Sequence, residues 1–465
     1  MPFFQRQVCP QVPLEFSKCF GANNMDKHHS MSSTEARERG YRSVVNAWAM
    51  YDWANSAFAV IILTAVFPVY YRALVINAGG SSADATAYWA YTTSASLLIV
   101  ALLGPVLGAT ADIVGGKKRF LRLALLLGVL GSIGLVFLGE DRFLLGSLTF
   151  AISNVGFAGG NIFYEALLPH VALPNDVDRV SARGYALGYL GGGLLLIVNV
   201  LWLLRPDWFW MPSREFALRA SFVSVGVWWF IFALPLFRNV PEPAGAERAG
   251  VSWRVVVSGV HRLVRTLRHI RRYKQLVLFL AAFWIYNDGI GTIIKLATAY
   301  GDEIGIQHNH MLMALVLTQL IGFPSTLGFG ALARYAGAKR SIFLGLAAYL
   351  IISIAGFFMT SALHFYVLAV LVGLVQGGTQ ALSRSLFAIM VPKERSSEFF
   401  GFFSTGQKFA GIIGPAIFGL VGQLAGSSRW GILSVALLFI VGAALLWRVD
   451  EKKGRRLAET DKDSA

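Results

Sequence analysis

The sequence predicts an all-α membrane protein with 12 transmembrane helices in two six-helix halves. Of its 465 residues, 55% are hydrophobic and only 14% are charged, whereas soluble globular proteins carry about 25% charged residues. Twelve apolar stretches can be marked, each near the roughly 20 residues that a helix needs to cross a bilayer. The stretches are continuous and do not alternate, which excludes an outer-membrane β-barrel. The loops are too short to hold a large soluble catalytic domain.

The apolar stretches set the expected organisation of the chain. We expect spans at 44–71, 88–113, 120–139, 143–170, 184–204, 217–237, 275–299, 310–333, 341–360, 364–390, 398–424 and 430–448. The corresponding units are an N-tail (1–43), a first half (44–237), a linker (238–274), a second half (275–448) and a C-tail (449–465).

The net charge of +15 reflects topology and not nucleic-acid binding. When alternate loops are assigned to alternate sides, most of the 41 Lys and Arg residues fall on the side that holds both tails. The other side holds only Arg72, Arg142, Arg205, Arg214, Arg219 and Arg429. By the positive-inside rule both termini are cytoplasmic. We therefore expect a multi-pass protein of the cell's inner (plasma) membrane, a monomer that meets lipid and a small-molecule substrate but no nucleic acid.

The tails and the linker carry weaker signals. The N-tail has no apolar core of signal-peptide length, so the first span is expected to be retained, and Met1, Met25 and Met31 are alternative starts. Cys9 and Cys19 are interpreted as reduced tail thiols. In the linker, apolar residues and arginines occupy opposite faces of a helix expected to lie along the cytoplasmic membrane surface, as a packing linker or a regulatory element.

The two halves contain an internal repeat. Gly108, Gly115 and Lys117 at the end of the second span recur as Gly330, Gly337 and Lys339 at the end of the eighth. The first copy, Gly-x-x-x-Asp-x-x-Gly-x-Lys-Lys-Arg, resembles the signature loop of the major facilitator superfamily. The resemblance implies that fold and a conformational latch in which Asp112 lies among helix N-termini of the opposing half and holds an outward-open state. Its residues are Gly108, Asp112, Gly115, Lys117, Lys118 and Arg119. The second copy has Arg334 in place of the acid.

Four further segments resemble the vacuole-effluxer branch of that superfamily, which comprises fungal autophagy-related vacuolar amino acid effluxers and their bacterial relatives. The segments are Tyr51 to Phe58, Phe163 to Pro169, Tyr286 to Gly289 with Thr292, and Gly377 to Ser385. This chain has Glu165 where the branch is expected to have Asn. The resemblance implies export of an amino acid.

Polar residues form stripes in the first, fourth, seventh and tenth spans. These are the spans that line the cavity in the superfamily that the chain resembles. Ionisable groups at membrane depth are costly and therefore face an aqueous cavity or a partner. With Lys408 of the eleventh span, they give the expected substrate or proton pathway: Asp52, Asn55, Asn161, Tyr164, Glu165, Asn287, Asp288, Thr292, Lys295, Gln376, Gln380, Arg384 and Lys408.

Several of these residues have two interpretations. Asp288 either carries a coupling proton or pairs with Lys295, seven residues later on the same helical face. Asp52 carries a proton or bonds a neighbouring helix, and Glu165 lies in the pathway or in a cytoplasmic gate between the halves. Lys408 either pairs with one of these acids or binds substrate. Arg384 with Glu394 is expected to form a gate or a snorkelling pair.

The function that these observations favour is secondary transport of a small polar metabolite, an amino acid first, by alternating access and proton-coupled export. The alternatives are an importer, an exporter of drugs or other solutes, or a non-transport role such as a receptor or scramblase. No pair of histidines has metal-ligand spacing with an acid on a shared face, and no Gly-x-Ser-x-Gly elbow occurs, so we expect no enzyme, no metal and no cofactor beyond a coupling ion, H⁺. The sequence leaves open the substrate, the transport direction, H⁺ against Na⁺, and the oligomeric state.

The charge distribution makes a direct prediction about topology. Reporter fusions at Gly250 and at the C-terminus should report the cytoplasm, and a fusion at Ile306 should report the external side, because the basic loops are retained inside. Alkaline phosphatase and fluorescent-protein fusions measure this. A cytoplasmic signal at Ile306 would overturn the assigned spans.

Overall fold

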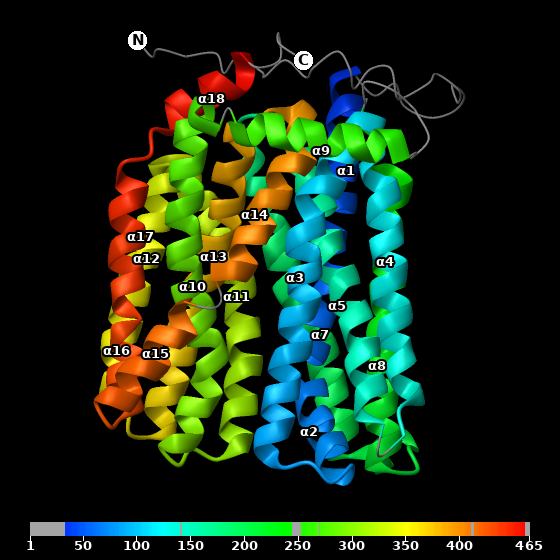
Figure 1. The fold of residues 1–465 in the computed structure, drawn as a ribbon, viewed down its shortest axis with the longest axis vertical. Coiled ribbons are helices and arrows are strands. Elements are labelled where there is room, and N and C mark those ends of the chain that lie inside the picture. The colour runs from blue at the N-terminus through cyan, green and yellow to red at the C-terminus, as the bar shows by residue number, and fades with distance from the viewer. Residues whose placement is uncertain (1–32, 140–141, 244–252, 269, 411–412, 461–465) are drawn as a thin grey trace, which may run out of the picture.

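The computed structural model describes residues 33–139, 142–243, 253–268, 270–410 and 413–460. Within these ranges every regular element is a helix, and the long helices run side by side as a bundle (Figure 1). Helix α9 (Trp253–Arg268) lies across one end of this bundle. We call this the α9 end. The start of α1 and helix α18 (Glu451–Thr460) lie at the same end.

The first half begins with a divided span. Helix α1 (Ser33–Ala57) continues into a π-helical stretch, Phe58–Ala65, which is followed by α2 (Phe67–Asn77). The two parts are bent by 41°, with Pro68 in the first turn of α2, where a missing N–H leaves no intrahelical bond unmade. The other helices are α3 (Ser82–Val114), α4 (Lys117–Gly134), α5 (Phe143–Ala166), α6 (Leu168–Val171), α7 (Val177–Leu204) and α8 (Arg214–Asn239).

The second half has one apolar stretch that the structure describes in two parts. The stretch expected as one span at 398–424 contains α14 (Ser396–Ala410) and α15 (Ile413–Leu424), and residues 411–412 between them lie outside the described residues. Pro415, in the first turn of α15, has no N–H to donate to the preceding turn. The other helices are α10 (Lys274–Glu303), α11 (His308–Ala336), α12 (Ala338–Phe357), α13 (Ala362–Met390), α16 (Ser428–Ser434) and α17 (Ala436–Trp447).

The spans agree with the apolar stretches, with differences at their ends. Among the described residues, ten helices are long and apolar enough to cross a membrane, and the bent first span makes eleven. Helices α14 and α15 occupy the remaining predicted span. Helix α3 begins at Ser82, before the expected 88, because Ser81 and Asp84 form a capping box: Asp84 N donates to Ser81 Oγ (3.1 Å) and Ser81 N to Asp84 Oδ2 (2.8 Å). Polar first turns therefore lengthen helices beyond their apolar parts.

Glycines allow a close approach of α4 and α5 in the first half. In α5, a Cβ on Gly156 would lie 2.6 Å from the Ala124 carbonyl oxygen and 2.7 Å from Gly128 Cα of α4. In lipid, apolar surface alone does not drive helices together, so close packing at small residues carries much of the association. On Gly159, three residues along the same helix, an added Cβ would meet no atom within 4 Å.

These two glycines provide a matched pair for a stability test. Gly156→Ala should lower the free energy of unfolding by about 1–3 kcal/mol, because the added methyl overpacks the contact with α4. Gly159→Ala should leave it unchanged or raise it by up to about 1 kcal/mol through helix propensity. Thermal unfolding of the purified protein in detergent compares them, and equal melting temperatures for the two variants would contradict the packing assigned to Gly156.

Candidate transport site

The first inter-half contact joins α3 to the start of α14. Asp112 is buried, and its carboxylate accepts hydrogen bonds from the backbone N–H groups of Ser397 (3.2 Å) and Glu398 (2.9 Å). Lys117 Nζ donates to the same carboxylate and to Ser397 Oγ (3.0 Å). A carboxylate at a helix N-terminus satisfies free N–H groups and complements the helix dipole. The structure thus places Asp112 at a helix N-terminus of the opposing half, as its motif implied.

The rest of the signature loop supports this contact. Gly115 ends α3 with φ +62°, a conformation that glycine adopts without strain, and Gly108 leaves no room for a side chain against the Ser397 backbone. Lys118 Nζ donates to the Phe237 (3.0 Å) and Val240 carbonyls at the end of α8. Arg119 is exposed and lies outside the contact.

The internal repeat is visible in the same type of bond. Lys339 Nζ donates to the carbonyls of Trp447 (2.9 Å) and Val449 (2.6 Å) at the end of α17. In each half, therefore, a lysine that begins one span binds the free carbonyls that end the last span, where a cation is favoured. By this contact Lys339 corresponds to Lys118. The sequence repeat had instead aligned Lys339 with Lys117, one residue earlier.

A second buried acid, Glu398, ties α9 to this end of the bundle. Arg395 donates to both of its carboxylate oxygens (3.0 and 3.1 Å), and Arg262 Nε of α9 lies 3.5 Å from Oε2. Arg262 also donates to the Glu394 carbonyl (3.3 Å). The sequence interpretation did not include Glu398. Its position in the first turn of α14, three residues after Arg395, is the signal that would have indicated it.

Another inter-half contact is an ion pair between α1 and α13. Arg384 is 1% exposed, and its NH1 and NH2 groups donate to Asp52 Oδ2 at 3.1 and 3.2 Å. Tyr164 Oη donates to the same oxygen (2.8 Å). The expected pairing of Arg384 with Glu394 is therefore wrong. Because Asp52 and Arg384 lie 332 residues apart, their pairing depends on how the two halves meet and leaves no trace in local spacing.

Arg384 is enclosed by groups from the first half. Its Nε donates to Ser181 Oγ (3.0 Å) and its NH2 to the Ser181 carbonyl (2.9 Å). The guanidinium carbon lies 5.0 Å from the ring centroid of Trp48, 5.6 Å from that of Tyr164 and 4.3 Å from that of Tyr185. These distances are within cation–π range. Sequence reasoning missed Trp48, Ser181 and Tyr185. Trp48, four residues before Asp52 and so on the same face of α1, was open to prediction.

Asp288 has a different partner from the one considered in the sequence. Its Oδ2 accepts the Gly414 N–H at the start of α15 (2.6 Å), whereas no ion pair with Lys295 occurs between these two described residues. Thr292 Oγ1 donates to the Asp288 carbonyl (2.7 Å). Asp288 is 2% exposed, and its Oδ1 has no hydrogen-bond partner among the described residues. One oxygen of this buried carboxyl is thus satisfied by a helix N-terminus and the other is available.

The remaining predicted residues fall into separate groups. Asn55 Nδ2 donates to Asn161 Oδ1 (2.7 Å), which joins α1 to α5 inside the first half. Glu165 is buried, and Asn287 and Gln380 are half-buried. The Lys408 side chain lies outside the described part of the structure.

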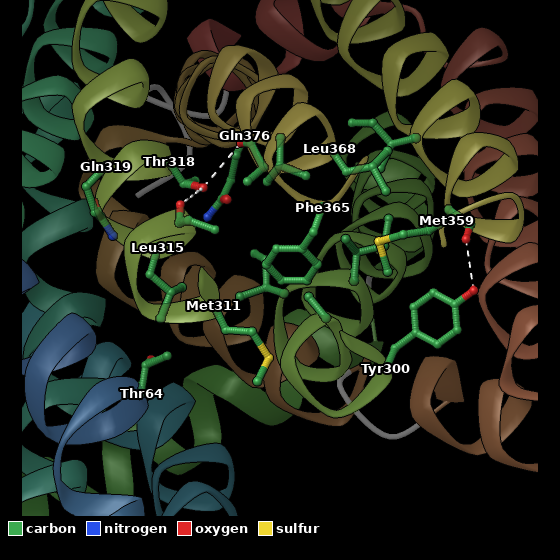
Figure 2. A pocket seen from close by; sticks show the side chains of 18 of the residues that line it. Thr64, Tyr300, Met311, Leu315, Thr318, Gln319, Met359, Phe365, Leu368 and Gln376 are labelled. Atoms are coloured by element: carbon green, nitrogen blue, oxygen red, sulfur yellow. Dashed lines mark hydrogen bonds between the residues drawn. The ribbon is translucent and has the colours of Figure 1, made fainter. Parts of the chain in front are cut away.

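A cavity of about 250 Å³ lies toward the opposite end of the bundle. The second half provides most of its wall, from the ends of α10 and α12 and the starts of α11 and α13, and Thr64 comes from the first half. Figure 2 shows Thr318, Gln319 and Gln376 on one side and apolar side chains such as Met311, Phe365 and Met359 on the other. Of the predicted pathway residues, the cavity reaches Gln376 alone. The amides of Gln319 and Gln376 have no hydrogen-bond partner within the described chain, so they are available to a solute.

Similarity to known proteins agrees with this architecture. A family model described as "Vacuole effluxer Atg22 like" matches residues 73–459. The chain belongs to this family. The relative YxiO of Bacillus subtilis, an uncharacterized MFS-type transporter, is 37% identical over 419 residues, 90% of this chain and 97% of YxiO. Autophagy-related protein 22 of Yarrowia lipolytica is 24% identical to the Atg22-like chain over 470 residues, 83% of this chain and 79% of that protein.

Solved structures place the Atg22-like chain in a known fold. The proton:xylose symporter XylE, a major facilitator superfamily protein, matches with a TM-score of 0.67 over 91% of this chain and 99% of XylE, at 14% identity. The Atg22-like protein is therefore a multi-pass membrane transporter with the major facilitator fold, and the family resemblance seen in the sequence is confirmed.

The contact at Asp112 leads to a test of the latch in this Atg22-like protein. Asp112→Asn keeps the size but removes the charge that α14 and Lys117 stabilise, so the open population at the α9 end should rise about tenfold. The open population can be measured by maleimide labelling of a Ser385→Cys variant in which Cys9 and Cys19 are replaced by serine. Ser385 is buried at this end, so the label reaches position 385 only when the end opens. Asp207→Asn, outside the spans, is the control. An unchanged labelling rate in Asp112→Asn would argue against a latch.

Proposed function

We propose that this protein exports a small solute, an amino acid in the first place, in exchange for protons by alternating access. The observation that carries the proposal is that buried charges join the two halves at the α9 end, whereas the cavity lies toward the other end. A transporter of this fold must close one end before the other opens. The Asp52–Arg384 pair and the Asp112 contact are bonds that such a cycle makes and breaks.

The orientation follows from charge. The α9 end carries Arg262, Lys118 and Lys339 together with the basic residues of α18 (Figure 1), so we assign it to the cytoplasm. The protein then lies in the plasma membrane with both termini inside, and the conformation described above is outward-facing.

The Asp52–Arg384 ion pair supports a zwitterionic substrate. Opening the α9 end separates Asp52 from Arg384, and each buried charge then requires a new partner, because removing one partner of a buried pair costs about 3–5 kcal/mol. The ammonium and carboxylate of an amino acid are complementary to these two charges. A neutral sugar offers neither charge. When the α9 end is open, contacts of Asp52 and Arg384 with the substrate would thus replace their contact with each other.

The cavity supports an apolar side chain on that substrate. Its volume of about 250 Å³ lies just below the range of drug-sized pockets, which begins at about 300 Å³. Most of its wall is Ile, Leu, Met, Val and Phe, with the amides of Gln319 and Gln376 at one side. An amino acid with its polar backbone groups near these two amides and its apolar side chain against the rest of the wall would fit this cavity.

Asp288 is our candidate for proton coupling. Its Oδ1 is buried without a hydrogen-bond partner among described groups, and a proton on this oxygen would remove the cost of the buried charge. Asp52, by contrast, is neutralised by Arg384 in this state. Protonation of Asp288 would also weaken its bond to the α15 N-terminus, which couples the proton to the position of a helix.

The experiment is transport by purified protein in proteoliposomes with a panel of labelled amino acids. We expect counterflow for amino acids with apolar side chains and uphill accumulation when a pH gradient is imposed. Asp288→Asn mimics the protonated form, so it should lose at least about 90% of gradient-driven accumulation and keep counterflow. Asp207→Asn should behave as the parent protein.

Three outcomes would contradict parts of this proposal. Full gradient-driven accumulation in Asp288→Asn would remove Asp288 as the proton carrier. Accumulation driven by Na⁺ and not by H⁺ would replace the coupling ion. Lipid flipping without flux of any amino acid would favour a scramblase over a transporter of this substrate class.

A further inference from the structure

A second cavity, of about 360 Å³, lies between α7 of the first half and α11 of the second. It shares no lining residue with the transport cavity. Its wall contains three arginines, Arg179, Arg183 and Arg334, and no acidic residue, together with apolar side chains that include Leu187, Phe323 and Leu327. Arg179 and Arg334 are exposed and Arg183 is half-buried, so the cavity opens at the surface as a crevice. We call it the arginine crevice.

Within the described part of the structure, the three arginines have no acidic partner. None of them forms a hydrogen bond or an ion pair with a residue that the structure describes. The two acids of the adjoining turn bind elsewhere: Asp178 Oδ1 accepts from Ser385 Oγ (2.5 Å) and Asp176 Oδ2 from Tyr41 Oη (3.2 Å). Three like charges around one crevice repel each other unless an anion binds between them.

The apolar part of the crevice decides what kind of anion fits. Leu187 follows Arg183 by one helical turn on α7, and Leu327 and Phe323 precede Arg334 by two and three turns on α11, so both stripes lead away from the α9 end, toward the middle of the membrane. Leu327 is 42% exposed. A soluble anion makes no use of such a wall, whereas a phospholipid places its phosphate among cations and its acyl chains along apolar side chains.

We propose that the arginine crevice binds the head group of an anionic phospholipid from the leaflet at the α9 end. The bound lipid takes the place of the latch that the second repeat lacks. In the first repeat, Asp112 of α3 binds the start of α14, and a Cβ on Gly108 would collide with that backbone. In the second repeat, Gly330 of α11 lies against α7, where its Cβ would be 2.6 Å from Ala182 Cβ, but Arg334 replaces the acid.

The lipid phosphate then supplies the negative charge that Arg334 cannot. It binds cations from both halves, Arg179 and Arg183 on one side and Arg334 on the other, and so holds α7 and α11 together. The anionic lipid therefore stabilises the state in which the α9 end is closed. This inference does not depend on the transported solute.

The binding test uses the full-length protein in nanodiscs and in detergent, without any transport substrate. Phosphatidylglycerol should bind more tightly than phosphatidylcholine, as measured by the melting temperature and by lipid retention in native mass spectrometry. In the triple variant Arg179→Gln, Arg183→Gln and Arg334→Gln, the affinity for phosphatidylglycerol should fall about 100-fold, since each arginine contributes roughly a factor of five. The control replaces Arg340, Arg448 and Arg456, three exposed arginines at the same end, with glutamine and should keep the affinity.

Two results would overturn lipid binding at this crevice. One is unchanged preference for phosphatidylglycerol in the triple variant. The other is an equal rise in melting temperature with inorganic phosphate or glycerol phosphate, which would assign the crevice to a soluble anion.

A second variant tests the latch role separately. Labelling of Ser385→Cys, with Cys9 and Cys19 replaced, should slow at least fivefold when phosphatidylglycerol is added to the parent protein and should not change in the triple variant. Arg334→Asp restores the acid of the motif, so its labelling should be slow with or without anionic lipid. Labelling of Arg334→Asp that still depends on phosphatidylglycerol would contradict the proposal that lipid replaces the missing acid. These readouts measure conformation and lipid, so they stay informative if the proposed amino-acid export fails.

Discussion

A carboxylate removed from water needs a cation, a proton or N–H donors, and this constraint determines which helices of the protein meet at the α9 end. Asp52 is satisfied by an arginine of the other half, Asp112 by a helix N-terminus of the other half, and Glu398 by arginines that include one from the linker helix. Apolar packing would hold the bundle in many relative positions of the two halves. The buried charges select one, and a cycle that opens this end must provide substitutes for each partner.

The predictions from sequence succeeded where the signal is local or where the family motif carries it. The apolar stretches located the spans, and the signature loop placed Asp112 at an opposing helix start, because glycine spacing and the following lysines restrict the turn around it. The polar stripes identified Asp52 and Arg384 individually but not as a pair, since Glu394 is near Arg384 in sequence whereas Asp52 is brought to it by the closure of the halves. The spacing of Asp288 and Lys295 along one helix face suggested a pair for a similar reason.

The rest was not available from sequence for a physical reason. A cavity lined by Ile, Met, Leu and Phe has no residue type that distinguishes it from ordinary helix packing, and of the predicted pathway residues only Gln376 reaches it. The contact between Asp288 and the start of α15 was also missed, because the apolar residues of the expected eleventh span continue past this point. Gly414 and Pro415 mark the start of α15, yet glycine and proline are common enough in membrane helices to be overlooked. The acid that binds this start, Asp288, lies 126 residues earlier.

The partners of Asp112 have a consequence for how the sequence can drift. The two partners of Asp112 on α14 are the backbone N–H groups of Ser397 and Glu398, and every amino acid except proline supplies such a group. The positions on α14 can therefore change in evolution without loss of these two bonds, while the position on α3 cannot. The Asp52–Arg384 pair is the opposite case, because both side chains are needed and a change on either side demands a compensating one. Covariation between the halves should thus be concentrated at the ion pair and be nearly silent at the helix start, although both contacts close the same end.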